Sequence, residues 1–145
     1  MPAKRFLPGE IAWTDLTIRE AAPVRDFYRR VVGWKVRNVS MGEYDDFGMV
    51  PRGSSKMIAG VCHARGVNAD LPPVWLIYVL VKNLDRSLQV CVSMGGSVVT
   101  PPRPMGKGRM CVIRDPAGAQ MVLYELSTKS KGRRSTTRPR GAKRE

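Results

Sequence analysis

WLIYVLVKNLDRSLQVCVSMGG (residues 75–96), followed by GRMCVIRDPAGAQMVLYEL (residues 108–126), decides the fold of this chain. The same order of patterns occurs earlier in the sequence with no insertion. Gly96 falls on Gly33 and Ile113 falls on Val50, an offset of 96 − 33 = 63 residues. The chain is therefore interpreted as two copies of one unit, which bury their apolar faces together.

The second copy shows a strand, a capped helix and further strands. Residues 74–81 predict a strong strand, and Asn83 is a good N-cap for a helix with an apolar stripe. The stripe consists of Leu84, Leu88, Cys91 and Val92. A Pro- and Gly-rich loop (residues 101–108) precedes the last two strands, and a tight turn over residues 115–118 joins them. Ile77 and Val79 are expected to pack under Leu84 and Leu88.

The first copy has the same plan. Residues 11–18 (IAWTDLTI) predict a strand whose Leu16 and Ile18 face a following helix, which ends at Gly33. The apolar stripe of the helix consists of Val24, Phe27, Tyr28 and Val31. Phe27 and Val31 are expected to pack on the strand, and Arg25 is expected to point to water. Three further strands are expected over residues 34–40, 43–51 and 56–62.

These elements predict an α+β domain over residues 1–127 with two βαβββ modules. The modules cover residues 10–62 and 74–126, and residues 63–73 connect them. Residues 128–145 carry eight Lys or Arg and one Glu, a charge of 8 − 1 = +7 out of a total of +13. This polar segment is predicted to be a disordered basic tail.

Cysteine usage and hydropathy indicate the compartment. Cys62, Cys91 and Cys111 form no CxxC pair, which favours a reducing cytoplasm. No apolar run approaches the length of about 18 residues that a membrane span needs. We therefore expect a cytoplasmic protein that does not enter a membrane.

The arrangement resembles the vicinal oxygen chelate superfamily, which contains glyoxalases, bleomycin-resistance proteins and extradiol dioxygenases. The residues that carry the resemblance are Phe27-Tyr28, Gly33-Trp34 and the DP-x-G turn that begins at Asp115. Further short motifs from Pro72 to Arg109 are similar to a bacterial, glyoxalase-related branch. The resemblance implies that the two modules curve into an open, incomplete β-barrel with the helices outside, commonly as a homodimer.

The resemblance also implies four positions at which such proteins usually hold a divalent metal. In this chain they carry Trp13, Ala59, Leu76 and Val122, and none of these side chains can ligate a metal. His63 lies outside them. We therefore expect no metal and no cofactor, which disfavours glyoxalase I and dioxygenase activity.

Strand alternation then predicts which residues face a cavity between the modules. The expected ligand-binding residues are Trp13, Asp15, Leu76, Tyr78, Arg109, Val122 and Tyr124. Arg109 could hold a carboxylate or phosphate of the ligand. The alternative is that these residues close a packed barrel.

Three functions are compatible with this sequence. The first is metal-free binding of a small organic molecule, including resistance by sequestration. The second is an enzyme of the same superfamily, with lyase, isomerase or hydrolase chemistry, that uses Asp15, Tyr78 or Tyr124. The third is association with nucleic acid through the basic tail between Lys129 and Arg144, although a solubilising tail explains the same charges.

Overall fold

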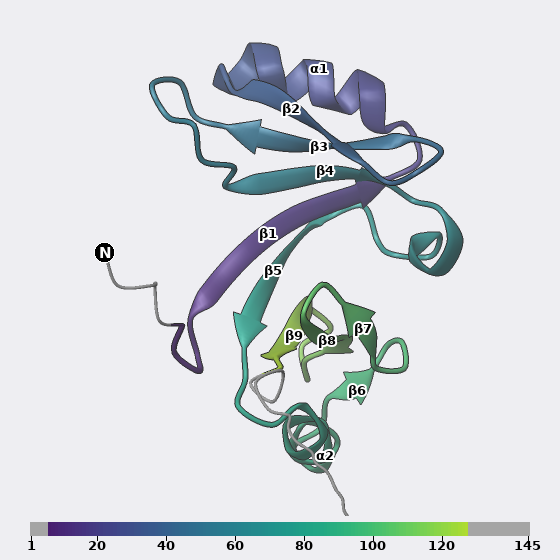
Figure 1. The fold of residues 1–145 in the computed structure, drawn as a ribbon. Coiled ribbons are helices and arrows are strands. Elements are labelled where there is room, and N and C mark those ends of the chain that lie inside the picture. Colours follow the sequence, from purple (N-terminus) through teal and green to yellow (C-terminus); the bar gives the residue numbers. More distant parts are fainter. Residues whose placement is uncertain (1–5, 128–145) are drawn as a thin grey trace, which may run out of the picture. The chain divides into compact units, whose positions relative to one another are not determined.

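The structure, a computed structural model, describes residues 6–127. The chain divides into two compact units, which we call the N-terminal unit (Ile11–Tyr78) and the C-terminal unit (Met1–Glu10 with Val79–Glu145). Each contains one helix and several strands (Figure 1). The α+β class is confirmed. The predicted tail, residues 128–145, lies outside the described residues.

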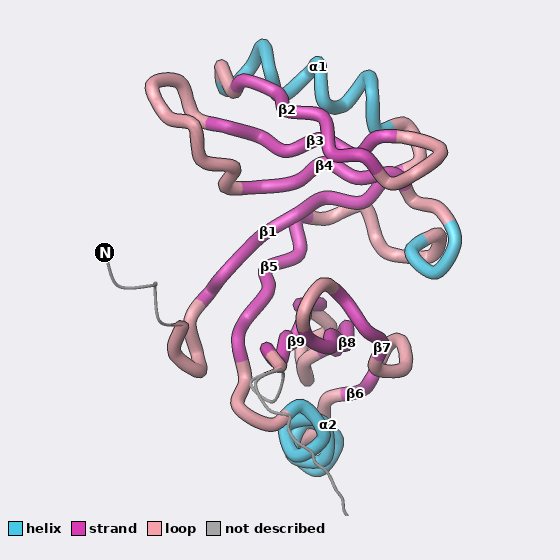
Figure 2. The backbone as a smooth tube through the Cα atoms, viewed as in Figure 1, coloured by secondary structure: helices cyan, strands magenta, loops and turns pink. Residues whose placement is uncertain are grey.

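The N-terminal unit follows the predicted order of elements. They are β1 (Ile11–Ile18), α1 (Ala21–Val32), β2 (Lys35–Ser40), β3 (Asp45–Val50), β4 (Ala59–His63), the 3₁₀ helix η1 (Gly66–Asn68) and most of β5 (Trp75–Leu80). Figure 2 shows the loop of residues 51–58 between β3 and β4. The strand order is β2-β3-β4-β1-β5, in which β1 and β4 are parallel and the pairs β2–β3 and β3–β4 are antiparallel.

Helix α1 covers one face of this sheet (Figure 1), and of its predicted stripe Tyr28 packs against the core. Phe27 and Val31 are 56% and 64% exposed, so the prediction that they pack on the sheet is wrong. Ala21 is buried instead, and the Arg25 guanidinium lies 4.4 Å from the centroid of the Phe47 ring. A guanidinium can lie over an aromatic ring in a cation–π contact, which accounts for Arg25 facing the sheet.

The end of α1 agrees with the prediction. Gly33 adopts the left-handed conformation (φ 88°), and its N–H donates to the Arg29 carbonyl oxygen at 3.0 Å. A residue with a side chain is strained in this conformation, so a glycine ends the helix cleanly. The chain can then turn directly into β2.

The C-terminal unit begins with the last two residues of β5. It continues with α2 (Leu84–Ser93), β6 (Ser97–Val98), β7 (Arg103–Met105), β8 (Gly108–Arg114) and β9 (Gln120–Leu126). Strand β8 pairs antiparallel with β6, β7 and β9. The sequence analysis expected a loop where β7 lies. The turn at Gly106 and Lys107 places Met105 opposite Gly108, which closes a short hairpin there.

Helix α2 packs on β8 and β9 as its stripe predicts. The side chain of Asn83 accepts a hydrogen bond from the Arg86 N–H at 3.0 Å, which confirms the N-cap. Leu84 is buried with the core residues Cys111, Ile113 and Leu123. Val92 is exposed, so its place in the stripe was wrong.

Among the residues that the structure describes, no helix is long and apolar enough to cross a membrane.

The buried face of β5 is the opposite of the one predicted. Ile77 is 36% exposed, whereas Leu76, Tyr78 and Leu80 are buried. Strand alternation puts these three on one face. In β1, the consecutive residues Asp15, Leu16 and Thr17 are all buried. A strand that is covered on both faces loses the clean alternation on which the prediction relied.

Candidate functional site

A buried carboxyl group in the N-terminal unit accepts hydrogen bonds from two side chains. Asp15 is only 6% exposed. The Tyr78 hydroxyl donates to its two oxygens at 3.3 and 3.2 Å, and the Trp13 indole Nε1–H donates to Oδ2 at 3.3 Å. The structure thus brings together three of the predicted site residues, two from β1 and one from β5.

The surroundings of Asp15 change its acidity. The pKa of Asp15 is raised to about 6, chiefly by burial. The hydrogen bonds from Tyr78 and Trp13 act to lower this pKa, and the charge of Asp46 acts to raise it. A carboxyl group with such a pKa exchanges its proton near neutral pH, which is the requirement for a general acid or base. The carboxyl group can therefore take up or release a proton near neutral pH.

A second buried carboxylate lies on β3, close enough to Asp15 to act on its charge. Asp46 Oδ1 accepts hydrogen bonds from the His63 backbone N–H at 2.9 Å and lies 3.2 Å from His63 Nδ1. Sequence reasoning missed Asp46, although an acidic residue inside the apolar strand DDFGMV was a usable signal.

Burial, with the nearby Asp15 and Asp46, raises the pKa of the Cys62 thiol. Cys62 is therefore a poor nucleophile at neutral pH.

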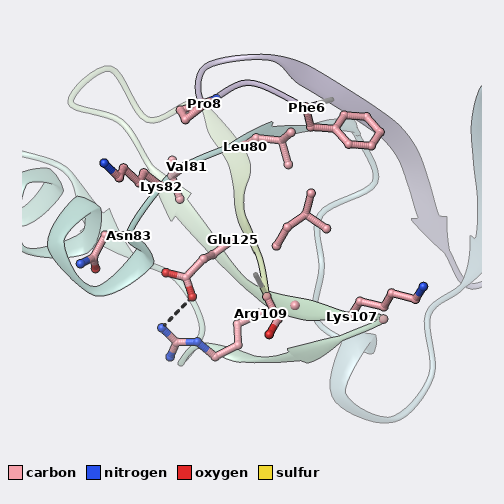
Figure 3. A pocket seen from close by; sticks show the side chains of 13 residues that line it. Phe6, Pro8, Leu80, Val81, Lys82, Asn83, Lys107, Arg109 and Glu125 are labelled. Atoms are coloured by element: carbon pink, nitrogen blue, oxygen red, sulfur yellow. Dashed lines mark hydrogen bonds and ion pairs between the residues drawn. The ribbon is translucent and has the colours of Figure 1, made fainter. Parts of the chain in front are cut away.

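The C-terminal unit contains a pocket of about 1070 Å³ (Figure 3). Its apolar wall includes Phe6, Leu80 and Leu126, and its cationic side chains are Lys82, Lys107 and Arg109. Figure 3 shows Arg109 and Glu125 facing each other at one edge, with Phe6 and Leu80 at another. The remaining lining residues are Pro8, Val81, Asn83, Gly106, Gly108 and Ser127.

Arg109 was predicted as a ligand-binding residue and does line this pocket. Its Nη2 lies 3.4 Å from Glu125 Oε1 and 3.3 Å from Asp85 Oδ2. The other oxygen of Glu125 accepts a hydrogen bond from the Leu84 N–H at 2.9 Å. Glu125 therefore joins the first turn of α2 to Arg109 and fixes one side of the pocket. Sequence reasoning missed the other lining residues, which carry no shared local motif.

The remaining predicted residues have other surroundings. Leu76 and Val122 are fully buried. The Tyr124 hydroxyl donates to the Met105 carbonyl oxygen at 2.8 Å, which joins β9 to β7. Burial raises the pKa of this hydroxyl, so Tyr124 stays protonated at neutral pH. Its role in ligand binding stays a prediction.

The resemblance implies a divalent metal, and the residues at the four implied positions do not suit one. Trp13, Ala59, Leu76 and Val122 offer no lone-pair donor of the kind that such ions need. Within residues 6–127, no group of three or more His, Cys, Asp or Glu side chains is arranged to hold a metal ion. We derive no chemical step through a metal.

Comparison with known proteins shows which family this chain belongs to. Residues 10–123 match the family model of the Glyoxalase/Bleomycin resistance protein/Dioxygenase superfamily. The chain belongs to this superfamily. That membership accounts for the repeated order of a strand, a helix and further strands in the two units.

Relatives of this chain include two proteins of Streptomyces. The chain is 32% identical over 136 residues to the anthracycline biosynthesis protein DnrV of Streptomyces peucetius, a match that covers 83% of this chain and 48% of DnrV. It is 31% identical, with the same coverage, to the anthracycline biosynthesis protein DauV of Streptomyces sp. strain C5. The chain thus spans about half the length of these curated relatives.

A solved structure supports the superfamily fold. The methylmalonyl-CoA epimerase of Mycobacterium tuberculosis is 18% identical, with a TM-score of 0.51, over 88% of this chain and 93% of the epimerase. A likeness at this identity concerns the fold alone. The chemistry of the epimerase is therefore not transferred to this chain.

Proposed function

We propose that this chain binds a small organic molecule in the pocket of the C-terminal unit. The observation that carries the proposal is a pocket of about 1070 Å³ with an apolar wall and three cationic side chains. Small-molecule sites are typically concave and mostly apolar, with a few polar groups that orient the ligand. The matching ligand has an apolar ring body and an acidic or hydroxyl substituent.

The relatives support this ligand class. DnrV and DauV are named as anthracycline biosynthesis proteins, and anthracyclines are fused-ring molecules with several hydroxyl groups. Phe6 and Leu80 would contact the rings, and Lys107 or Arg109 would face the oxygen substituents. Resistance by sequestration is one use of such binding.

An anthracycline aglycone provides the first test. Titrated into the labelled full chain, it should shift the amide NMR signals of Gly106 and Gly108, which line the pocket, until the site is saturated. Signals of Gly42 and Gly53 in the N-terminal unit serve as internal references. Equal shifts at all four glycines would show non-specific association and contradict the proposal.

Charge reversal at the pocket gives a second readout. The probe 1-anilinonaphthalene-8-sulfonate combines fused rings with an anionic group, so the exposed Lys107 should attract it. Lys107→Glu should weaken its binding by about ten-fold, the loss of roughly one charge-assisted contact. Lys56→Glu changes the charge of the chain equally in the N-terminal unit. Equal losses in the two variants would exclude the pocket as the binding site.

A second candidate function is proton transfer by Asp15. One observation favours it. Asp15 is a buried carboxyl group with a pKa of about 6, and it accepts a hydrogen bond from the Tyr78 hydroxyl. Such a group could remove a proton from carbon next to a carbonyl group and return it to the ligand. The residue would then make the protein an enzyme of isomerase or lyase type.

Hydrogen exchange on a fused-ring ketone tests this candidate. With 1-tetralone in D₂O, the full chain should catalyse exchange of the hydrogens beside the carbonyl group, detected by NMR. Asp15→Asn should abolish the catalysed exchange because the amide cannot accept the proton. Asp70→Asn, the change of an exposed carboxylate in the same unit, should retain it. Identical rates for both variants and the original chain would rule out Asp15 as the base.

Three other expectations remain proposals. They are assembly as a homodimer, location in the cytoplasm and contact with nucleic acid through the segment from Lys129 to Arg144. The last segment lies outside the residues that the structure describes. The fold and the two sites described above do not depend on any of them.

A further inference from the structure

A basic cleft occurs in the N-terminal unit, on elements that the proposed function does not use. Its volume is about 560 Å³. It is lined by residues from the end of α1, the start of β2 and the loop of residues 51–58. The lining residues are Arg29, Arg30, Gly33, Trp34, Lys35, Val36 and Arg52.

The charges in this cleft are all of one sign. Four of the seven lining residues are cationic, and none is acidic. Arg29 approaches Asp26 only at 3.9 Å, and Arg25 already bonds both oxygens of that carboxylate at 3.0 and 3.2 Å. Within the described residues 6–127, Arg30, Lys35 and Arg52 form no ion pair. The cleft therefore concentrates positive potential.

Helix-end electrostatics explain only part of this arrangement. Cations at the last turn of a helix interact favourably with its C-terminal carbonyl groups, which accounts for Arg29 and Arg30. Lys35 belongs to β2 and Arg52 to the loop between β3 and β4, so the helix does not explain why they face the same cleft. Their convergence needs a separate reason.

Local contacts hold these two side chains at the cleft. The Lys35 ammonium donates to the Ser54 carbonyl oxygen at 2.7 Å, which ties β2 to the loop. A Cβ atom at Gly33 would lie 3.4 Å from Arg52 Nε, so the glycine leaves room for the guanidinium to pass close to the helix end. Lys35 is thus positioned by a backbone carbonyl group, and Arg52 lies in the space beside Gly33.

We propose that this cleft binds a ligand that carries linked phosphoryl groups, such as a nucleoside triphosphate. Guanidinium groups match phosphate oxygens in geometry and form charge-assisted hydrogen bonds with them. Arg30 and Arg52 are the main phosphate contacts, and Lys35 adds a point charge. Trp34 also lines the cleft, with its ring packed beside Tyr28 and Trp75, so its fluorescence can report whether a base binds there.

Calorimetric titration of the full chain with ATP at physiological salt tests the site. Arg30→Gln with Arg52→Gln should weaken binding at least about ten-fold, because the charge-assisted hydrogen bonds to phosphate are lost. The control is Arg86→Gln with Arg114→Gln, which removes the same charge from exposed positions of the C-terminal unit. This control should change the affinity less than about two-fold, since distant exposed charges are screened.

The outcomes separate the cleft from general charge attraction. Equal weakening in the two double variants, or no binding of ATP by the original chain, would overturn the proposal. Binding of a single-stranded oligonucleotide without any binding of ATP would also overturn it, because the ligand would then be a nucleic acid that the whole basic chain attracts.

Inorganic tripolyphosphate identifies which part of the ligand is recognised. If it binds as well as ATP and both lose affinity in the Arg30 and Arg52 variant, the cleft recognises phosphoryl groups alone, as proposed. If ATP binds more tightly and quenches tryptophan fluorescence that Trp34→Phe removes, the ring also contributes. Binding of both ligands that is insensitive to Arg30 and Arg52 contradicts the assignment.

Discussion

Replacing Gly108 with alanine is expected to destabilise the C-terminal unit strongly. Gly108 begins β8 and lies opposite Leu126 of β9. A Cβ atom there would collide with the Glu125 carbonyl oxygen and come within 3.1 Å of the Leu126 Cα atom. Both obstacles are backbone atoms, so no side-chain rotation relieves them. The β8–β9 ladder would have to open where the two strands border the pocket.

The expected loss is about 3 kcal/mol, at the upper end of the usual cost of overpacking. For a chain of this size, thermal unfolding monitored by circular dichroism should show a Tm that falls by roughly 10 °C. Gly53→Ala is the matched control, since its φ of 80° strains an alanine but no atom lies within 4 Å of the added Cβ. It should cost only about 1 kcal/mol. A similar Tm for both variants would contradict the steric argument.

The elements were predictable where their signals are local. Strand β1 has the bounds Ile11–Ile18 and β9 the bounds Gln120–Leu126, both as expected. The start of β9 was predictable from the turn before it, in which Asp115 Oδ1 accepts hydrogen bonds from the N–H groups of Ala117 and Ala119. Such a turn is encoded by a few adjacent residues.

Packing was less predictable because it depends on partners distant in the sequence. The stripe of α1 indicated a helix but only part of its buried face: Tyr28 packs against the core, whereas Phe27 and Val31 are exposed. Ala21 is buried instead, and the Arg25 guanidinium lies over the Phe47 ring. The hydropathy of an arginine does not reveal that its guanidinium can lie over an aromatic ring.

The candidate sites were also predictable only in part, because their contacts join residues that are distant in the sequence. Asp15 and Tyr78 occupy equivalent positions of the repeat, 78 − 15 = 63 residues apart, and both were predicted. Their mutual hydrogen bond was not, because it depends on the pairing of β1 with β5. The pocket of the C-terminal unit combines the ends of three strands with Phe6 and Pro8, and no local pattern marks such a combination.

Asp15→Asn is expected to stabilise the protein at pH 7. The folded-state pKa of about 6 is above the ordinary value of 3.8, so folding favours the protonated carboxyl group. The contribution of this group to stability is fully present below about pH 4 and is lost as the pH rises through 6. At pH 7 the ionised form costs up to about 3 kcal/mol, from roughly two pKa units at 1.36 kcal/mol each. A neutral amide removes this cost.

Asparagine can also keep the hydrogen bonds of the site. Its carbonyl oxygen, placed where Oδ2 lies, can accept from both Trp13 and Tyr78, and its NH₂ group can donate to the Tyr78 oxygen. Urea unfolding should therefore give a variant that is about 1–3 kcal/mol more stable at pH 7 and equal to the original chain near pH 4. The exposed Asp70→Asn should leave the pH profile unchanged. If Asp15→Asn is less stable at every pH, the carboxylate stabilises the fold. If it is more stable yet loses hydrogen exchange on 1-tetralone, Asp15 reduces stability while serving a chemical function.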